Sequence, residues 1–210
     1  MQIEIQNVSK IIDKNIILKN INMKLESGKI YGFIGRNGSG KTMLLKMICG
    51  FVKPTDGKII INNQDIFSKN YFTNDIRALI EHPKFLGNIT GYENLKLLAN
   101  INNTITDEDI LKWLDILNMS EEKDKIYNKY SLGMKQKLGL IQVLMENPKI
   151  IILDEPFNAL DEESLNKIRH ILKEEKEKDK IIIIATHIKE DIEKLCDTIY
   201  HFANGHVSLK

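Results

Sequence analysis

The spacing of hydrophobic and polar residues divides the chain into a strand-rich first third and a longer part in which helices and strands alternate. Hydrophobic residues alternate with polar ones at residues 3–6 and recur through residues 16–25, which is typical of strands with one buried face. The first of these stretches alternates like an edge strand. A turn at residues 53–57 leads into a further strand at residues 58–62. We therefore predict mostly strands and turns in this part of the chain.

Helical spacing begins near residue 90, where two sequences typical of helix starts follow each other. Thr90 and Glu93 form a capping box, in which each side chain can bond the backbone amide of the other residue, ahead of a helix through residues 94–100. Thr106 begins a second such signal, followed by hydrophobic residues at helical spacing within residues 110–117. We therefore predict a helical segment in the middle of the chain.

The last part of the chain alternates between strands and helices. The elements predicted here are strands at 149–153 and 181–185, helices at 162–178 and 189–196, and a hairpin at 197–210 around Asn204 and Gly205. Short aliphatic strands separated by helices indicate a parallel sheet covered by helices. The pattern therefore predicts an α/β fold.

Composition and charge narrow the function classes. The chain has 210 residues, of which 42% are hydrophobic and 28% charged, ordinary values for a globular protein with one core. Lys and Arg number 30 against 29 acidic residues, so charge gives no case for nucleic acid or an anionic membrane as the main partner. Cys49 and Cys196 lie far apart in hydrophobic surroundings and predict buried thiols in a reducing cytosol. No stretch is typical of a signal peptide or a membrane span, so we expect a cytoplasmic chain.

A glycine-rich motif at residues 35–42 indicates nucleotide binding. It matches G-x-x-x-x-G-K-T without a mismatch, between a short hydrophobic strand at residues 29–34 and a helix-like stretch at residues 42–49. Its glycines let backbone N–H groups approach phosphates, and the start of the helix adds partial positive charge. We expect Lys41 to reach the β- and γ-phosphates and the Thr42 hydroxyl to help hold Mg²⁺. The predicted nucleotide-binding residues of this motif are Gly35, Arg36, Asn37, Gly38, Ser39, Gly40, Lys41 and Thr42.

Two adjacent acids, Asp154 and Glu155, follow the aliphatic strand. An acid at the carboxyl end of a parallel strand lies beside the phosphate loop in a doubly wound sheet. We expect Asp154 to bind Mg²⁺, directly or through water, and Glu155 to act as the general base on the attacking water. Together with the phosphate loop, these acids predict hydrolysis of a nucleoside triphosphate.

Residues 130–137 carry a family resemblance. Their sequence is Tyr-Ser-Leu-Gly-Met-Lys-Gln-Lys, between the phosphate loop and the Asp-Glu strand. The segment resembles the signature Leu-Ser-Gly-Gly-Gln of ATP-binding cassette (ABC) ATPases: Ser131, Gly133 and the following Gln136 are kept, whereas three other positions differ. Ser131 is suited to cap the helix that starts there, which leaves N–H groups and the positive end of the helix dipole free for an anion. A helix cap alone would account for these residues, but not for their place in the family's order of motifs.

The resemblance covers essentially all of the chain and implies one nucleotide-binding domain over residues 1–210. It implies a P-loop NTPase (RecA-like) parallel-sheet core with an N-terminal antiparallel β subdomain and an α-helical insert at about residues 87–145. The implied cofactors are ATP and Mg²⁺. The implied assembly is a head-to-tail dimer with a second copy or another ABC ATPase, attached to separate transmembrane permease subunits at the inner face of the cell membrane. In such a dimer the signature contacts the γ-phosphate held by the opposite chain through Ser131, Leu132, Gly133 and Met134.

Two later segments follow the family's order. Residues 158–161, Asn-Ala-Leu-Asp, resemble the D-loop, which implies that Asp161 faces the partner subunit. The strand at 181–185 leads to Thr186 and His187 and resembles the strand before the switch histidine. By this resemblance Thr186 is a nucleotide-binding residue, and His187 contacts the γ-phosphate and senses its loss. His187 joins Lys41 and Glu155 as a predicted catalytic residue.

Two positions depart from the family. Where a glutamine usually links the core to the helical insert, this chain has Glu81, which brings a carboxylate near the metal. Two consequences are open: tighter Mg²⁺ binding, with Glu81 as a metal-side group, or a raised pKa of Glu81 beside Asp154 and Glu155. The alternative is that Glu81 points to solvent on a coupling loop. Where relatives stack adenine on an aromatic residue, the chain offers only aliphatic side chains; we assign the base contact to Ile12, which leaves the preference for ATP over GTP open.

Glu81 with its neighbours, and the signature segment, resemble one subgroup: the ATPase subunits of bacitracin-resistance and lantibiotic self-immunity exporters. The predicted function is therefore ATP hydrolysis that drives export of a peptide antibiotic or lantibiotic. The alternative is a non-transport ABC ATPase acting on nucleic acid or the ribosome. Such proteins usually carry two cassettes or a long coiled coil, whereas this chain has one phosphate loop, no sustained heptads and nearly balanced charge, so no nucleic-acid partner is expected. A small-molecule kinase would leave residues 130–137 unexplained.

Overall fold

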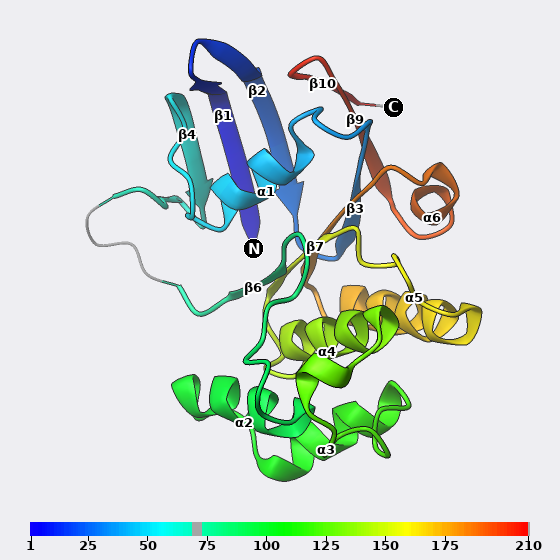
Figure 1. Cartoon of the computed structure of the whole chain (residues 1–210). Coiled ribbons are helices and arrows are strands. Elements are labelled where there is room, and N and C mark those ends of the chain that lie inside the picture. Colours follow the sequence, from blue (N-terminus) through cyan, green and yellow to red (C-terminus); the bar gives the residue numbers. More distant parts are fainter. Residues whose placement is uncertain (69–72, 210) are drawn as a thin grey trace.

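Two β-sheets and a group of helices form the computed structural model, which describes residues 1–68 and 73–209 (Figure 1). Within the described residues, the antiparallel sheet contains, in spatial order, β2 (Asn15–Glu26), β1 (Gln2–Ile12), β4 (Asp56–Ile61) and β5 (Gln64–Asp65). The second sheet contains, in spatial order, β10 (His206–Leu209), β9 (Thr198–Ala203), β3 (Lys29–Ile34), β8 (Ile181–Thr186), β7 (Ile150–Asp154) and β6 (Ile76–Leu79). All pairs in this second sheet are parallel except the β9–β10 hairpin. The predicted α/β class is therefore confirmed.

The strand β1 lies in the middle of its sheet, so the prediction of an edge strand was wrong. It pairs with β2 on one side and with β4 on the other. Its buried residues Ile3, Ile5 and Val8 belong to the core, while their polar neighbours are more exposed. Alternation of this kind reports that one face of a strand is buried; it carries no information on whether a strand is central or at an edge.

Six α-helices and one short 3₁₀ turn lie in the described part of the chain. They are α1 (Lys41–Ile48), α2 (Gly91–Asn102), α3 (Asp107–Ile116), η1 (Tyr127–Lys129), α4 (Leu132–Leu144), α5 (Glu162–Glu177) and α6 (Lys189–Glu193). Both predicted capping boxes are present, Thr90 with Glu93 and Thr106 with Asp109. The helix after β8 ends at Glu193, three residues before the predicted end. The hairpin around Asn204 is confirmed, but Lys210 at its predicted end lies outside the described residues.

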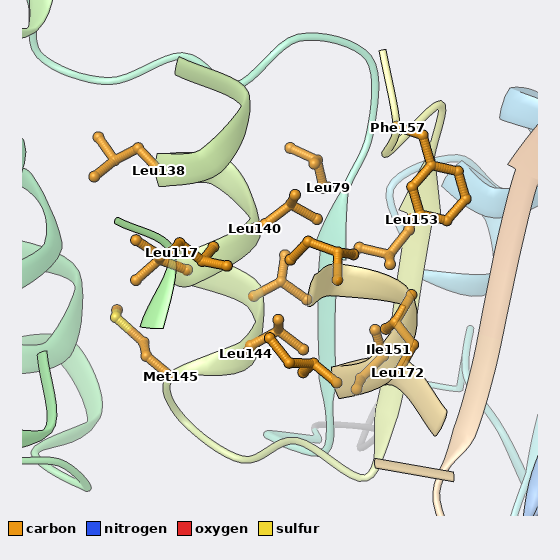
Figure 2. Packing of buried hydrophobic residues seen from close by; sticks show 14 of the residues in the cluster. Leu79, Leu117, Leu138, Leu140, Leu144, Met145, Ile151, Leu153, Phe157 and Leu172 are labelled. Carbon is orange, nitrogen blue, oxygen red and sulfur yellow. The ribbon is translucent and has the colours of Figure 1, made fainter. Parts of the chain in front are cut away.

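The parallel sheet separates two hydrophobic clusters. Alternate residues of β7 point to its two faces: Ile151 and Leu153 pack with the helices α4 and α5, whereas Ile150 and Ile152 pack with β1, β2 and α1. Figure 2 shows side chains of α4 and α5, among them Leu140, Leu144 and Leu172, gathered with Ile151 and Leu153 of the sheet. Because both faces of β7 and β8 are covered, their sequences are unbroken aliphatic runs.

The helical segment docks on this same core. In Figure 1, α2 and α3 lie at the far end of the molecule from the antiparallel sheet, with α4 and α5 between them and the parallel strands. Buried residues of α2 and α3, such as Leu95, Ile110 and Leu114, belong to one cluster with Leu138 of α4. The insert is therefore held by hydrophobic contacts that are continuous with the nucleotide-binding half of the chain.

The two cysteines are single thiols, each partly buried. Burial raises the pKa of Cys49 to about 12, and burial together with the charge of Asp197 raises the pKa of Cys196 to about 12. Both thiols therefore stay protonated near neutral pH. Among the described residues, no helix is both long and apolar enough to cross a membrane.

The shared cluster gives a stability test within one helix. Leu114 of α3 is fully buried, so Leu114→Ala should lower the free energy of unfolding by about 2–5 kcal/mol. Leu111, three residues earlier on α3, is exposed, and Leu111→Ala should change it by less than about 0.5 kcal/mol. Urea denaturation of both variants measures the difference. Equal losses in the two variants would show that the insert does not pack on the core as described.

Candidate nucleotide-binding site

The phosphate loop connects β3 to α1 through backbone conformations that favour glycine. Gly38 and Gly40 have φ of 78° and 102°, in the left-handed region that side chains disfavour. Space is also restricted: a Cβ atom on Gly40 would lie 2.6 Å from Leu18 Cδ2, and one on Gly35 would lie 2.4 Å from the Phe202 carbonyl oxygen. Backbone conformation therefore favours glycine at Gly38, and close packing requires it at Gly35. Both constraints apply at Gly40.

Lys41 lies buried at the end of this loop, where α1 begins. Its Nζ donates hydrogen bonds to the carbonyl oxygens of Gly35 (2.7 Å) and Arg36 (3.3 Å). Burial lowers the pKa of the Lys41 ammonium, and the charges of Glu155 and Asp154 oppose that shift. The hydroxyl of Ser39 is also buried in the loop and has no hydrogen-bond partner among the described residues. An orphaned donor beside an ammonium group and a helix N-terminus fits the binding of a phosphate.

Thr42 and Asp154 bring two oxygen donors together beside the loop. The Thr42 hydroxyl donates to Asp154 Oδ2 at 2.7 Å. Burial raises the pKa of Asp154, opposed by the Thr42 hydrogen bond and by Lys41. The described residues contain no cluster of three or more His, Cys, Asp or Glu side chains suited to a metal ion. Mg²⁺ commonly takes one or two protein oxygens and completes its shell with phosphates and water, so this sparse pair fits a nucleotide-bound Mg²⁺.

Glu155 is held by two side chains from the end of β8. Thr186 donates from its hydroxyl to Glu155 Oε2 (2.9 Å), and His187 Nδ1 lies 2.8 Å from Glu155 Oε1. The backbone N–H of Glu155 donates to the Ala185 carbonyl at 2.8 Å, which continues the pairing of β7 with β8 beyond the strand end. Thr186 is fully buried and bonds Glu155, so its predicted contact with nucleotide stays a prediction. The arrangement fixes the direction of the Glu155 carboxylate.

Three residues in or next to the site occupy a strained backbone region. Glu81, Glu155 and Ala159 have φ of 61°, 50° and 62°. Among the other described non-glycine residues with positive φ, all but Lys14 are Asn or Asp, which tolerate this region. Strain of this kind costs about 1–3 kcal/mol per residue and persists where the surrounding structure imposes it, most often at functional sites.

Glu81 projects toward the cleft and forms an ion pair with α1. Its Oε1 lies 2.5 Å from Nζ of Lys46, on the helix that begins at the phosphate loop. The hydrogen bond and charge of Lys46 lower the pKa of Glu81. The alternative of a raised pKa was therefore wrong, because the nearest charge is a cation and not the carboxylates of Asp154 and Glu155. The alternative of a side chain that merely points to solvent does not hold either, although Glu81 remains mostly exposed. Its role toward Mg²⁺ stays a prediction.

The signature segment is tied to the backbone around Glu155. Ser131 caps α4, as predicted, accepting a hydrogen bond from the Met134 N–H at 3.2 Å. Gln136 is buried and donates to the carbonyl oxygens of Glu155 (3.2 Å) and Pro156 (3.0 Å). A Cβ atom on Gly133 would lie 2.7 Å from the Ala159 carbonyl oxygen. Gly133 thus allows the segment after Glu155 to lie directly against α4.

Asp161 has partners within its own chain. It caps α5, accepting from the Ser164 N–H at 2.8 Å and from the Ser164 hydroxyl at 3.0 Å. Lys137 of α4 lies 3.3 Å away. These bonds, the Ser164 N–H first, lower the pKa of Asp161 to about 2, so it stays ionised at physiological pH. The contact of Asp161 with a partner subunit stays a prediction.

A cleft of about 690 Å³ brings together most of the predicted residues from the three strand ends, but Gly35, Arg36 and Thr186 do not line it. Its described lining is Ile17, Asn37, Gly38, Ser39, Gly40, Lys41, Thr42, Met43, Lys46, Glu81, His82, Gln136, Asp154, Glu155, Asn158 and His187. Sequence reasoning assigned no site role to Ile17, Met43, Lys46 and His82 of this set, and it placed Asn158 in the segment like the D-loop without a contact to the nucleotide. Ile12 is not part of the lining, and its contact with the base stays a prediction; Ile17, on the neighbouring strand β2, lines the cleft instead. The signature residues, from Ser131 to Met134, lie outside it.

A model of the family described as ABC transporter matches residues 18–158, more than half of the chain. The chain belongs to the ABC transporter family. It is an ATP-binding subunit, and as an ABC ATPase it hydrolyses ATP. The order of phosphate loop, signature and Asp-Glu strand along the chain suggested this family. In the structure the phosphate loop and the two acids line the cleft, and the signature segment begins α4.

Curated relatives extend the likeness over nearly the whole chain. An uncharacterised ABC transporter ATP-binding protein, YybJ of Bacillus subtilis, is 39% identical, covering 97% of this chain and 93% of that protein. The bacitracin transport ATP-binding protein BcrA of Enterococcus faecalis is 37% identical over 98% of this chain and 67% of its own length. The lantibiotic transport ATP-binding protein SrtF of Streptococcus pyogenes is 33% identical, covering 99% and 90%.

Solved structures confirm the fold. An ATP-binding subunit of an ABC transporter superposes with a TM-score of 0.89 at 24% identity, over 100% of this chain and 90% of that one. A dimeric ATP-binding cassette in a post-hydrolysis state, bound to ADP and phosphate, superposes with a TM-score of 0.85 at 23% identity, over 99% and 98%. The predicted P-loop NTPase core with an antiparallel subdomain and a helical insert is thereby confirmed.

The Lys46–Glu81 ion pair gives a test of Glu81 as a metal-side group. Glu81→Gln should raise the Mg²⁺ concentration needed for half-maximal ATP binding by about two- to fivefold, the effect expected of one exposed charge. Lys46→Met frees the Glu81 carboxylate and should lower that concentration. Mg²⁺ titrations of ATP binding measure both shifts. Lys149→Met, which removes an exposed ion pair with Asp75 away from the cleft, is the control. An unchanged midpoint in Glu81→Gln would exclude a metal-side role.

Proposed function

We propose that this ABC ATPase pairs with a second ATPase chain on binding ATP and drives separate transmembrane subunits that export a peptide antibiotic or lantibiotic. One observation carries the proposal. The cleft gathers the phosphate loop, Asp154, Glu155 and His187, whereas the signature residues lie outside it. A site with every hydrolytic group except the signature is half of a composite site, which a second chain completes.

The chain's own residues account for hydrolysis of the γ-phosphate. The loop N–H groups, the Ser39 hydroxyl and Lys41 bind the phosphates and offset the charge that develops on the phosphate oxygens. Glu155, fixed by Thr186 and His187, orients the attacking water and accepts its proton. Mg²⁺, held by Thr42 and Asp154 when bound, would neutralise charge on the β- and γ-phosphates. Loss of the γ-phosphate changes the surroundings of His187, which lies half-exposed at the cleft.

The opposing signature supplies the missing contacts. Ser131 at the start of α4 leaves the N-terminus of that helix facing outward, and Leu132 beside it is exposed. A helix N-terminus is a suitable ligand for a phosphate. In a head-to-tail pair each chain therefore places Ser131, Leu132, Gly133 and Met134 against the γ-phosphate held by the other, with Asp161 near the boundary.

The segment from Glu81 into the helical insert is the proposed connection to the permease. It joins the cleft to α2 through residues 81–90, where Leu86 is a large exposed hydrophobic residue. The Lys46–Glu81 pair links this segment to the helix of the phosphate loop, so changes at the nucleotide reach it over a short path. Through such partners the chain would lie at the inner face of the membrane.

The cargo follows from relatives and not from the site. BcrA is named for bacitracin transport and SrtF for lantibiotic transport, at 37% and 33% identity. Both cargoes are antibiotic peptides, and this common class is the one proposed here. Nearly balanced charge, 30 basic against 29 acidic residues, gives no support to the alternative of a nucleic-acid-directed ATPase.

Complementation between two inactive variants tests the composite site. Lys41→Ala removes phosphate binding, and Ser131→Arg places a bulky cation where the opposite γ-phosphate is expected. Each should lose nearly all hydrolysis alone, whereas a mixture should regain activity because mixed dimers contain one intact pair of half-sites. Phosphate release from the separate and mixed proteins measures this. A mixture as inactive as its components would contradict the composite site and leave the phosphate-loop assignment unaffected.

The cargo class is tested in the source organism. Deletion of the gene should lower the minimal inhibitory concentration of bacitracin or of a lantibiotic at least several-fold, with no change for an antibiotic that is not a peptide. The wild-type gene should restore resistance, and the Lys41→Ala gene should not. Unchanged sensitivity to the whole panel of peptide antibiotics would contradict the proposed cargo while leaving the ATPase activity intact.

A further inference from the structure

Arg169 is a mostly buried cation outside the nucleotide cleft, and it contacts two segments that lead out of the cleft. It lies in the middle of α5, and its Nη2 donates to Asp191 Oδ1 of α6. Its guanidinium carbon also lies 5.7 Å from the ring centre of Phe157, within the range of a cation–π contact. The side chains of Arg169 and Asp191 are only 18% and 8% exposed, so this contact is largely shielded from water.

The two contacts of Arg169 fall on the two segments that carry Glu155 and His187. Phe157 comes two residues after Glu155, and Asp191 comes four residues after His187. Glu155 Oε1 and His187 Nδ1 are 2.8 Å apart. The Arg169 guanidinium therefore contacts both the segment after Glu155 and the segment after His187, and the side chains of these two residues meet in the cleft.

The helix α6 depends on such outside contacts for its position. It has five residues and no side-chain cap, and a helix of this length is not stable by itself. Its inner side is fixed by Ile192, which lies so close to β3 that a Cβ atom on Gly32 would be 2.7 Å from it. Asp191, the preceding residue, is fixed by Arg169. Removal of the guanidinium leaves α6 held by its contact with β3 through Ile192. Because α6 begins two residues after His187, its position affects that of His187.

The contact is poorly suited to a purely stabilising role. Arg169 Nε is buried without a hydrogen-bond partner among the described residues, which is costly for a charged group. Buried ion pairs often contribute little net stability, because desolvation offsets their attraction. Arg77 of β6 and Glu146 form a comparable pair, with side chains 17% and 5% exposed. That pair touches neither Glu155 nor His187 and provides a matched comparison.

We propose that Arg169 is a positioning residue for hydrolysis, which holds α6 and the segment after Glu155 in the register that brings His187 against Glu155. It contacts neither substrate nor the reacting atoms. This inference rests on the proposed roles of Glu155 and His187. Its consequence is that the loss of Arg169 acts on turnover through His187, and hardly at all on ATP binding.

The test is a double-mutant cycle with the full chain. Arg169→Met and Arg169→Lys are made in the wild type and in His187→Ala, and kcat and KM for ATP are measured together with thermal melting. Arg169→Met should lower kcat by about tenfold or more, as a displacement of about 1 Å can do, with KM changed less than about twofold. Arg169→Lys keeps a charge for Asp191 and should recover part of that loss. In His187→Ala, neither substitution should lower kcat further. Arg77→Met should lower the melting temperature without lowering kcat.

Three outcomes would overturn the proposal. They are equal fold-losses of kcat in both backgrounds, a lower melting temperature with unchanged kcat, or an equal loss of kcat in Arg77→Met. Where Arg169→Met does not fold, Asp191→Asn breaks the same contact at nearly constant volume and is judged by the same cycle. Full activity of His187→Ala alone contradicts the proposed role of His187 and this inference with it, whereas proportional losses contradict only the inference.

Discussion

The structure depends on the parallel pairing of three neighbouring strands, β3, β8 and β7. In register, Ile34 lies opposite Thr186, and Asp154 lies opposite Ala185. Parallel strands end at the same edge of a sheet, so this pairing brings the phosphate loop together with the Asp-Glu pair and His187, which lie more than a hundred residues further along the chain. Aliphatic side chains cover both faces of these strands, and the resulting dryness lowers the pKa of Lys41 and raises that of Asp154. The hydrophobic core thus sets both the geometry of the site and its electrostatics.

Backbone conformation adds a second constraint at this edge. Glu155 occupies the left-handed region just where β7 ends, and Glu81 and Ala159 do the same in the segments beside it. Hydrogen bonds donated by Gln136 and Thr186, and the one that the Glu155 N–H donates to the Ala185 carbonyl, hold Glu155 in that conformation. The surrounding packing offsets the backbone strain, and the direction of the Glu155 carboxylate is fixed before a nucleotide binds.

The sequence predicted the features that depend on neighbouring residues. It did not predict contacts between segments that are distant in the chain. Local sequence was sufficient to predict the glycine motif, the two capping boxes and the aliphatic strands before Asp154 and Thr186, and the structure contains all of them. The strand β6 has only four residues with an arginine among them, too short and mixed for a periodicity, and it exists because β7 offers it a partner. Lys46 resembles any exposed lysine of a helix until the fold places Glu81 beside it. Ile17 similarly lines the cleft only because β2 passes next to Gly40.

The helix α4 has a consequence for a pair of these chains. Ser131 at its start is the proposed ligand of a neighbour's phosphate, while Gln136, little more than one turn later, bonds the backbone of the chain's own Glu155. A rigid helix cannot respond at one of these points without shifting the other. In the proposed dimer, occupancy of one nucleotide site would therefore be energetically linked to the Glu155 carboxylate of the other, and thermodynamic reciprocity would make the linkage equal in both directions. The two nucleotide sites of such a pair would therefore not bind ATP independently of each other.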